Sequence, residues 1–312
     1  MKKTPKVSLI SPCYNGSSYI KWFLDSLVNQ TYKNVEFIFI NDGSTDNTEE
    51  IFMSYKSKLE KKGWQIIYIK QENKGLAATI NTGLQVFTGN YVFFPDSDDI
   101  LLPDHISEKV NFMEKNPEYA VAFCLIDAVN DRNLDKTLYT MDNSKCDQTS
   151  FSDNLINRKL SIWTGISSVF RSKCLLDVLP NRSIYPSRSG QNFQLLFPIS
   201  LKYKIGYIHK ILGKYVIRSS SMSRTIKSKP KHNAELFDIW VNTILSLDDT
   251  NANKAKYINK SYNHFVSSAA SSPVGFCKKV LLFGCVPLVK IKKKNNKTKI
   301  YFLGIYLFTI KD

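Results

Sequence analysis

The sequence lacks several features that would place it in a common protein class. Its six cysteines form no C-x-x-C pair, and no histidine lies at metal-ligand spacing, so a zinc site is not expected. Cysteines scattered in this way are typical of a reducing cytosol. The longest apolar run, residues 280–289, has ten residues, whereas a membrane-spanning helix needs about 20. The run at residues 7–10 is too short for a signal peptide, so we expect a cytoplasmic protein with no membrane-spanning segment.

Glycine-rich phosphate-binding motifs are also missing. No G-x-G-x-x-G follows the first predicted strand, and no G-x-x-x-x-G-K-[ST] occurs anywhere in the chain. These motifs hold phosphate groups on backbone N–H groups. A phosphorylated ligand would therefore need a metal ion to take over that role.

Acidic residues are scarce relative to basic ones. The chain has 43 Lys and Arg against 27 Asp and Glu, a formal net charge of +16. This favours nucleic acid, an anionic membrane surface or a phosphorylated ligand as a partner, although a solvated basic surface would give the same sum. The excess is uneven, because residues 278–299 contain eight lysines and no acidic residue. No nucleic-acid-binding motif is present, so we expect an anionic membrane surface, and no nucleic acid, as the partner of this basic tail.

The hydrophobic residues, 43% of the chain, predict a sizeable core. Over the first 125 residues, strand-like and helix-like patterns alternate. Such alternation predicts βαβ units and a mostly parallel sheet flanked by helices. The predicted strands lie at residues 7–10, 35–40, 65–69, 91–94 and 119–125, and the predicted helices at 18–29, 45–59, 76–87 and 104–114.

The remainder of the chain divides less clearly. The patterns predict a loop region at 127–153, a strand at 162–170, a helix at 191–203, strands at 206–209 and 214–218, and helices at 233–247 and 254–270. Residues 283–292 weakly resemble 303–311, which suggests a basic β-hairpin or paired strands. We therefore expect three parts: a main domain at 1–220, a helical extension at 221–275 and a basic apolar tail at 276–312.

Polar clusters follow four of the predicted strands. In open α/β sheets, ligands bind beyond the carboxyl ends of the strands. We therefore expect these clusters to meet at one edge of the sheet. They lie at residues 11–16, 41–46, 71–75 and 95–99.

The cluster Asp96-Ser97-Asp98-Asp99 is the strongest chemical signal. Carboxylates two residues apart after a strand can share one hard cation, and Mg²⁺ or Mn²⁺ is often bound by one or two carboxylates together with substrate phosphates. The alternative is an ordinary turn, since Asp and Ser are common turn residues. Its place beside three other polar clusters favours the metal site.

The cluster Asn41 to Asp46 supports two compatible interpretations. Ser44 or Thr45 can cap the next helix, and Gly43 can adopt a positive φ. This leaves Asp42 able to accept hydrogen bonds from the edge of a base.

Four sequence motifs, in their order along the chain, resemble those of glycosyltransferase family 2, which has the GT-A fold. They are Pro12-Cys13-Tyr14-Asn15, Asn41 to Asp46, Asn73-Lys74-Gly75 with Asn81 and Gly83, and Asp96 to Asp99. The resemblance covers roughly residues 6–218. It implies a Rossmann-like α/β domain that binds a nucleotide-sugar.

The resemblance also implies roles for single residues at the nucleotide. Pro12, Tyr14 and Asn15 would line the nucleotide pocket. Asp42 would read the base, usually uracil, and Lys74 would lie near the base or the diphosphate.

At the metal, the resemblance implies that Asp96 contacts the ribose and Asp98 binds Mn²⁺ or Mg²⁺, with Asp96 as the second carboxylate able to share the ion. Asp99 would support the metal site or the sugar. The ion would neutralise the charge of the leaving nucleoside diphosphate.

One segment departs from the family pattern. Inverting members usually carry an acidic pair that deprotonates the acceptor hydroxyl, whereas this chain has Gly190-Gln191-Asn192, as in a branch found among enzymes for bacterial polysaccharide. An amide cannot act as a general base. Either Asp99 substitutes, the acceptor is deprotonated in another way, or the protein is inactive. We expect an active enzyme in which Gln191 and Asn192 position the acceptor.

Three further side chains are weaker candidates. Arg218 and Arg224 lie in a serine-rich segment that family members often close over the diphosphate, although they could equally be solvated. Trp163 could stack on an acceptor sugar.

The resulting prediction is an inverting hexosyl- or N-acetylhexosaminyltransferase. It would move a sugar from a nucleoside-diphosphate-sugar, most often a UDP-sugar in this family, to a lipid-linked glycan acceptor for a bacterial surface polysaccharide such as O-antigen or capsule. The basic tail would hold it at the inner face of the plasma membrane, where each lysine contributes about 1 kcal/mol. The alternative is a catalytically inactive protein that binds a sugar-nucleotide or a glycan.

Overall fold

The computed structural model describes residues 4–142, 144, 151–156, 165–218, 229–269, 277–282, 286–294, 297–302 and 305–311. The chain divides into two compact units. The first contains residues 1–155 and 159–224, and the second contains residues 156–158 and 225–312.

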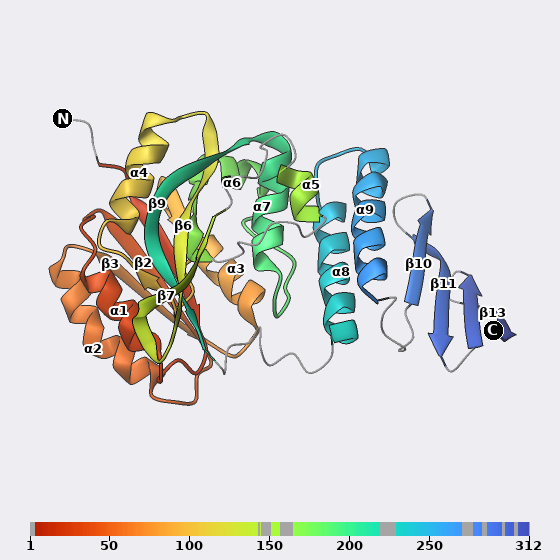
Figure 1. Ribbon diagram of the computed structural model, residues 1–312, viewed down its shortest axis with the longest axis horizontal. Helices are drawn as coiled ribbons and strands as arrows, with labels where there is room; N and C mark the ends of the chain where they lie inside the picture. The colour runs from red at the N-terminus through yellow and green to blue at the C-terminus, as the bar shows by residue number, and fades with distance from the viewer. Residues whose placement is uncertain are drawn as a thin grey trace. The chain divides into compact units, whose positions relative to one another are not determined.

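The first unit is built on one curved sheet flanked by helices (Figure 1). Its strands are β1 (Val7–Cys13), β2 (Val35–Asp42), β3 (Gln65–Gln71), β4 (Tyr91–Phe93), β5 (Ile100–Leu101), β6 (Tyr119–Asn130), β7 (Asn133–Met141), β8 (Ser168–Arg171) and β9 (Lys204–Ile217). Its helices are α1 (Ile20–Val28), α2 (Thr48–Lys61), α3 (Leu76–Val86), α4 (His105–Lys115), α5 (Phe151–Ile156), the 3₁₀ turn η2 (Gly165–Ser167), α6 (Ser172–Val178) and α7 (Gln191–Lys202).

The strand order explains why the polar clusters meet. The order is β3-β2-β1-β4-β8-β6-β9-β5, with β7 paired to β6. The neighbours β3, β2, β1 and β4 run parallel, so their carboxyl ends open on the same edge. Strand β8 is antiparallel to both β4 and β6, and β9 is parallel to β6. The predicted α/β class with a mostly parallel sheet is confirmed.

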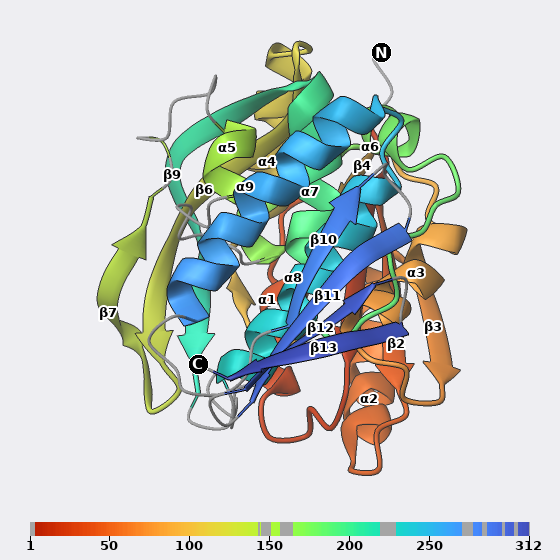
Figure 2. The same ribbon diagram turned by 90° about the vertical axis from the view of Figure 1, so that its right-hand side faces the viewer.

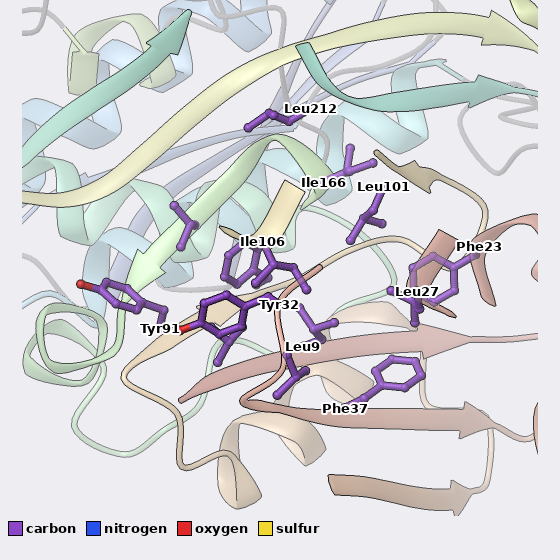
Figure 3. Close-up of a cluster of buried hydrophobic side chains, with 14 of the residues drawn as sticks. Leu9, Phe23, Leu27, Tyr32, Phe37, Tyr91, Leu101, Ile106, Ile166 and Leu212 are labelled. Atoms are coloured by element: carbon purple, nitrogen blue, oxygen red, sulfur yellow. The ribbon is translucent and has the colours of Figure 1, made fainter. Parts of the chain in front are cut away.

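Two layers of helices cover the sheet, and alternate residues of each strand face one layer or the other. Leu9 and Phe37 belong to the cluster formed with α1, α2 and α4, where Phe23 meets Phe37 edge-on at 6.1 Å (Figure 3). Ile10 faces α3 instead. A Cβ on Gly83 of α3 would lie 2.3 Å from Ile10 Cγ2, so α3 packs this closely only because residue 83 has no side chain. Helix α7 lies beside α3 and α6.

The prediction of a loop region at residues 127–153 was wrong. Strand β6 continues to Asn130 and pairs with β7, and α5 forms at Phe151–Ile156. Most of β7 is exposed, so it lacks the apolar alternation that marks a half-buried strand. The two strands predicted at 206–209 and 214–218 form one strand, β9, whose pairing with β6 contains register shifts.

The second unit contains two helices and a separate sheet. Helices α8 (Lys229–Leu245) and α9 (Asn251–Ala269) lie side by side (Figures 1 and 2). Strands β10 (Cys277–Leu282), β11 (Val286–Lys294), β12 (Lys297–Phe302) and β13 (Ile305–Lys311) form a four-stranded antiparallel sheet. Within the described ranges, no helix is both long and apolar enough to cross a membrane.

Candidate active site at the carboxyl ends of the strands

Hydrogen bonds join the loop that follows β1 to the loop that follows β2. Asn15 adopts a φ of 49°, a left-handed conformation that asparagine tolerates. Its Oδ1 accepts a hydrogen bond from the Thr45 N–H at 2.9 Å, and its own N–H donates to Ser44 Oγ at 3.0 Å. Pro12 is paired within the sheet, and Tyr14 is 48% exposed at the edge. The segment predicted to line the nucleotide pocket is therefore held in place, with one aromatic ring open to solvent.

Asp42 is buried at the end of β2, and its carboxylate organises the neighbouring loop. Oδ1 accepts hydrogen bonds from Gln71 Nε2 at 2.7 Å and from the Lys74 N–H at 3.0 Å. Oδ2 accepts from the Gly75 N–H at 3.0 Å. A carboxylate has about four acceptor positions, so three are used within the protein. The Lys74 side chain is exposed at the same edge.

Asp96 and Asp98 follow β4 and are both half-buried. Burial and the neighbouring charge of Asp98 raise the pKa of Asp96 to about 7, while a hydrogen bond from the Gly165 N–H opposes that rise. The charge of Asp98 therefore acts on Asp96, as expected for neighbouring carboxylates of one acidic cluster.

One of these two carboxylates, that of Asp98, already forms an ion pair with an arginine side chain of the protein. Arg218, at the end of β9, forms an ion pair with Asp98 in which Nη2 and Nε donate to Oδ2, the latter at 3.2 Å. The guanidinium lies over the ring of Tyr19, 3.9 Å from its centre. The Trp22 indole N–H donates to the Asp98 backbone oxygen at 2.8 Å. The start of α1 therefore forms an aromatic wall beside the acidic cluster.

Asp99 lies behind this cluster and is fully buried. Its Oδ1 accepts a hydrogen bond from the Val216 N–H at 3.1 Å, and its Oδ2 has no hydrogen-bond partner. Burial, and then the charges of Asp98 and Asp96, raise the pKa of Asp99 well above its usual value. At this depth Asp99 supports the cluster and β9 from behind and is not open to an acceptor hydroxyl.

The segment that leads into α7 is held against α3 and against Gly75, which precedes α3. Asn81 exchanges two hydrogen bonds of 2.8 Å with the backbone of Ile184. A Cβ on Gly75 would lie 3.2 Å from Arg188 Cα. Helix α7 therefore begins next to the loop that Asp42 holds.

Helix α7 opens with the segment that departs from the family pattern. Gly190 precedes it with a φ of 79°, a conformation suited to glycine. Gln191 and Asn192 form its first turn and are half-buried. The structure gives neither side chain a hydrogen bond to another described residue, which leaves both amides able to bind a ligand.

Sequence reasoning missed several contributors. Neither Tyr19 nor Trp22 was predicted to lie at the site. The contacts of Gln71 with Asp42 and of Gly165 with Asp96 were also missed, because they cross between distant segments. The candidates Trp163 and Arg224 lie outside the described residues.

A cavity of about 760 Å³ lies elsewhere, between Lys6, Asn90 and Arg171. None of the site residues above lines it. The Arg171 guanidinium there already donates to the backbone oxygens of Tyr119 and Met113, so its charge is engaged within the fold.

Comparison with known proteins decides the family. The model for glycosyl transferase family 2 matches residues 8–176, more than half of the chain. The chain belongs to glycosyl transferase family 2.

Curated relatives that are named as glycosyltransferases agree with this assignment. An uncharacterized glycosyltransferase of Rickettsia prowazekii is 32% identical over 76% of this chain and 71% of its own length. Glycosyltransferase GlyA of Streptococcus pneumoniae is 31% identical over 73% of this chain, but the match spans only 33% of GlyA.

Solved structures share the GT-A fold. Staphylococcus aureus TarS in complex with UDP-GlcNAc aligns over 85% of this chain and 74% of its own, with a TM-score of 0.64 and 21% identity. The mannosyltransferase PcManGT of Pyrobaculum calidifontis, in complex with GDP-Man and Mn²⁺, aligns over 87% of this chain and 76% of its own, with a TM-score of 0.54 and 15% identity. At these identities the likeness is one of fold.

Enzymes of this family and fold typically use a divalent metal ion. Among the described residues, no group of three or more His, Cys, Asp or Glu could hold such an ion without help. A pair of carboxylates is nevertheless a suitable donor set, because substrate phosphates complete the coordination of Mg²⁺ in many enzymes. The Asp98 carboxylate is engaged by the Arg218 guanidinium, so an ion that binds there would have to compete with this ion pair.

Proposed function

We propose that this glycosyltransferase moves a hexosyl or N-acetylhexosaminyl group from a UDP-sugar to a hydroxyl of a lipid-linked glycan, with inversion at the anomeric carbon. The product would belong to a bacterial surface polysaccharide such as O-antigen or capsule. Binding of UDP-GlcNAc by TarS, a protein of the same fold, supports the donor class.

The observation that carries this proposal is the acidic pair at the sheet edge. Burial and the charge of Asp98 raise the pKa of Asp96, and Asp98 itself forms an ion pair with Arg218. Such a pair suits Mn²⁺ or Mg²⁺ bound together with a diphosphate. When bound there, the ion would neutralise the charge of the leaving nucleoside diphosphate.

The protein's own residues would orient the donor. The exposed ring of Tyr14 and the fixed Asn15 loop would form one side of the nucleotide pocket, beside Pro12. Asp42 would offer its remaining acceptor position to the base. Lys74 would supply positive charge near the base or diphosphate.

The acceptor would bind at the start of α7. Gln191 and Asn192 would donate and accept hydrogen bonds there, as neutral amides do. Asp99 would act as a positioning residue, because it is buried behind Asp98 and holds β9 at Val216.

The three parts of the chain would have different functions. Residues 1–220 would form the catalytic domain, 221–275 a helical extension, and 276–312 a basic tail that contacts the anionic inner face of the plasma membrane. The protein would then be cytoplasmic and peripheral, close to a lipid-linked acceptor.

A donor assay tests this function. Release of UDP from a panel of UDP-sugars should require Mn²⁺ or Mg²⁺, and Asp98→Asn should lower it about a hundredfold, as when a transition-state charge contact is removed. Asp135→Asn is the matched control, because the Asp135 side chain is 99% exposed. Equal turnover in the two variants would refute the acidic-pair assignment.

The replaced acidic pair favours one alternative, an inactive protein that binds a sugar-nucleotide. Thermal-shift measurements with UDP and UDP-sugars separate the two, because a ligand that binds only the folded state raises the melting temperature. A shift in wild-type protein without any turnover would support the alternative.

A further inference from the structure

The sheet of the second unit separates its residues into two chemically different faces. In an antiparallel sheet, residues directly opposite each other lie on the same face, and successive residues alternate between faces. The register pairs Lys279 with Lys290, and Lys292 with Lys299. It also pairs Lys294 with Lys297, which in turn is paired with Lys311.

Seven lysines therefore share one face, which we name the lysine face. They are Lys279, Lys290, Lys292, Lys294, Lys297, Lys299 and Lys311. The opposite face carries eight apolar residues: Val280, Val289, Ile291, Ile300, Phe302, Ile305, Phe308 and Ile310. Only Lys278 and Lys293 lie on the apolar face.

This arrangement has an electrostatic cost. Like charges directly opposite each other on neighbouring strands destabilise a sheet. The lysine face contains such pairs on every adjacent pair of strands, and residues 276–311 contain no acidic residue to offset them. An anionic surface that faced the lysines would relieve this repulsion.

The lysine face also carries aromatic residues suited to a membrane interface. Tyr301 is paired with Lys290 and with Tyr306, so both tyrosines belong to this face. Tyrosine is enriched where one end of a side chain meets lipid and the other meets water. This favours a lipid surface over a soluble polyanion.

We propose that the lysine face is a docking surface for anionic phospholipid and lies flat against the bilayer. The proposal rests on the proposed function in one respect, namely that a lipid-linked acceptor gives the enzyme a reason to be there. It adds which face of the sheet would meet the headgroups: the face to which the strand register assigns the seven lysines, with Lys278 and Lys293 on the opposite face.

The test compares two variants with the same change in charge. Binding is measured to vesicles of phosphatidylcholine alone and of equal parts phosphatidylcholine and phosphatidylglycerol. Each lysine near an anionic surface contributes about fivefold in affinity, the ratio that corresponds to about 1 kcal/mol. Lys292→Gln with Lys299→Gln should therefore weaken binding to the anionic vesicles about 25-fold.

The control variant carries Lys278→Gln and Lys293→Gln on the apolar face. Its loss should be less than about fivefold, because charges on the far side lie near or beyond the Debye length of about 8 Å. Lys292→Arg with Lys299→Arg should preserve binding, which separates loss of charge from loss of folding. Equal losses in the two glutamine variants would overturn the proposal.

Two further results would also overturn it. One is equal binding to neutral and anionic vesicles. The other is tighter binding to soluble polyphosphate than to anionic vesicles, which would assign the face to a polyanion. UDP release by wild-type protein in vesicle-free solution is measured in parallel. Its absence would count against the proposed function alone, and absent vesicle binding with UDP release intact would count against the docking face alone.

Discussion

Arg218 holds the carboxylate that the proposed metal site needs. Its guanidinium donates to Asp98 and stacks on Tyr19, so it is fixed by two independent contacts. Charge-assisted hydrogen bonds of this kind are about twice as strong as neutral ones. A divalent ion that binds Asp98 must therefore compete with Arg218.

Replacement of Arg218 should remove this competition. Arg218→Gln should tighten Mn²⁺ binding in the absence of nucleotide about tenfold, since a charge-assisted contact contributes about 1.5 kcal/mol or more. Electron paramagnetic resonance of free Mn²⁺ measures the affinity directly. The exposed Arg132 provides the control variant Arg132→Gln, which should leave Mn²⁺ affinity unchanged. Weaker binding in Arg218→Gln would show that Arg218 assists the ion.

Glu36 is a second residue with a definite electrostatic role, at the opposite end of the strands. It is 1% exposed and accepts hydrogen bonds from Ser8 Oγ at 2.5 Å and Thr88 Oγ1 at 2.7 Å. Lys6 Nζ lies 2.5 Å from its Oε2. Burial raises the pKa of Glu36, but these partners more than offset it, so the pKa lies below its ordinary value of 4.5.

Because the folded state lowers the pKa of Glu36, its ionised form stabilises the protein. This stabilisation is complete above pH 4.5 and is lost as the pH falls through the lower, folded-state value. Glu36→Gln should cost about 2 kcal/mol at neutral pH, and the difference from wild type should shrink below pH 4.5. Urea unfolding at several pH values measures both effects. A constant difference across the acidic range would contradict this account.

At the scale of elements, the turn η2 connects the acidic cluster to the core. The Gly165 N–H donates to Asp96, and the buried Lys109 of α4 donates to the Ile166 backbone oxygen at 2.6 Å. A Cβ on Gly165 would lie 1.8 Å from the Phe94 backbone oxygen. The turn can therefore approach the end of β4 only because residue 165 is glycine.

Gly165→Ala should displace η2 from β4. The variant should lose about 3 kcal/mol or more, because backbone atoms cannot move aside cheaply, and Mn²⁺ affinity should fall with it. The control is Gly63→Ala, whose φ is also positive at 87° but whose Cβ would meet nothing within 4 Å. That variant should lose only about 1 to 2 kcal/mol from backbone strain. Denaturant unfolding of both proteins separates the clash from the strain.

The parallel half of the sheet was predictable because its signals are local. Buried strands such as Val35–Asp42 contain a dense apolar run, here residues 37–40, and polar residues mark where the run ends. The positions of Asp42, Asp96 and Asp98 on one edge followed from strand direction alone. The partners of these carboxylates did not follow, because Gly165 and Arg218 come from distant segments and no local pattern links them to Asp96 or Asp98. Strand β7 was missed for a related reason, since it gains its structure from pairing with β6.

At the scale of the whole molecule, the proposed functions divide between the two units. The first unit contains every residue assigned to the donor, the metal and the acceptor. The second contains the lysine face, which we propose docks on lipid. Because each unit is compact by itself, the proposed membrane contact should be separable from sugar transfer.

Deletion of residues 276–312 tests this separation. The truncated chain should release UDP from the donor at the wild-type rate in solution, because the deletion leaves residues 1–224 intact. It should no longer bind anionic vesicles, since all seven lysines of the lysine face are removed. Transfer to an acceptor embedded in those vesicles should fall more steeply than transfer to a detergent-solubilised acceptor, because only the former depends on local concentration at the surface. Equal losses with both acceptors would show that the tail contributes to the active site itself, and the two units would then not act independently.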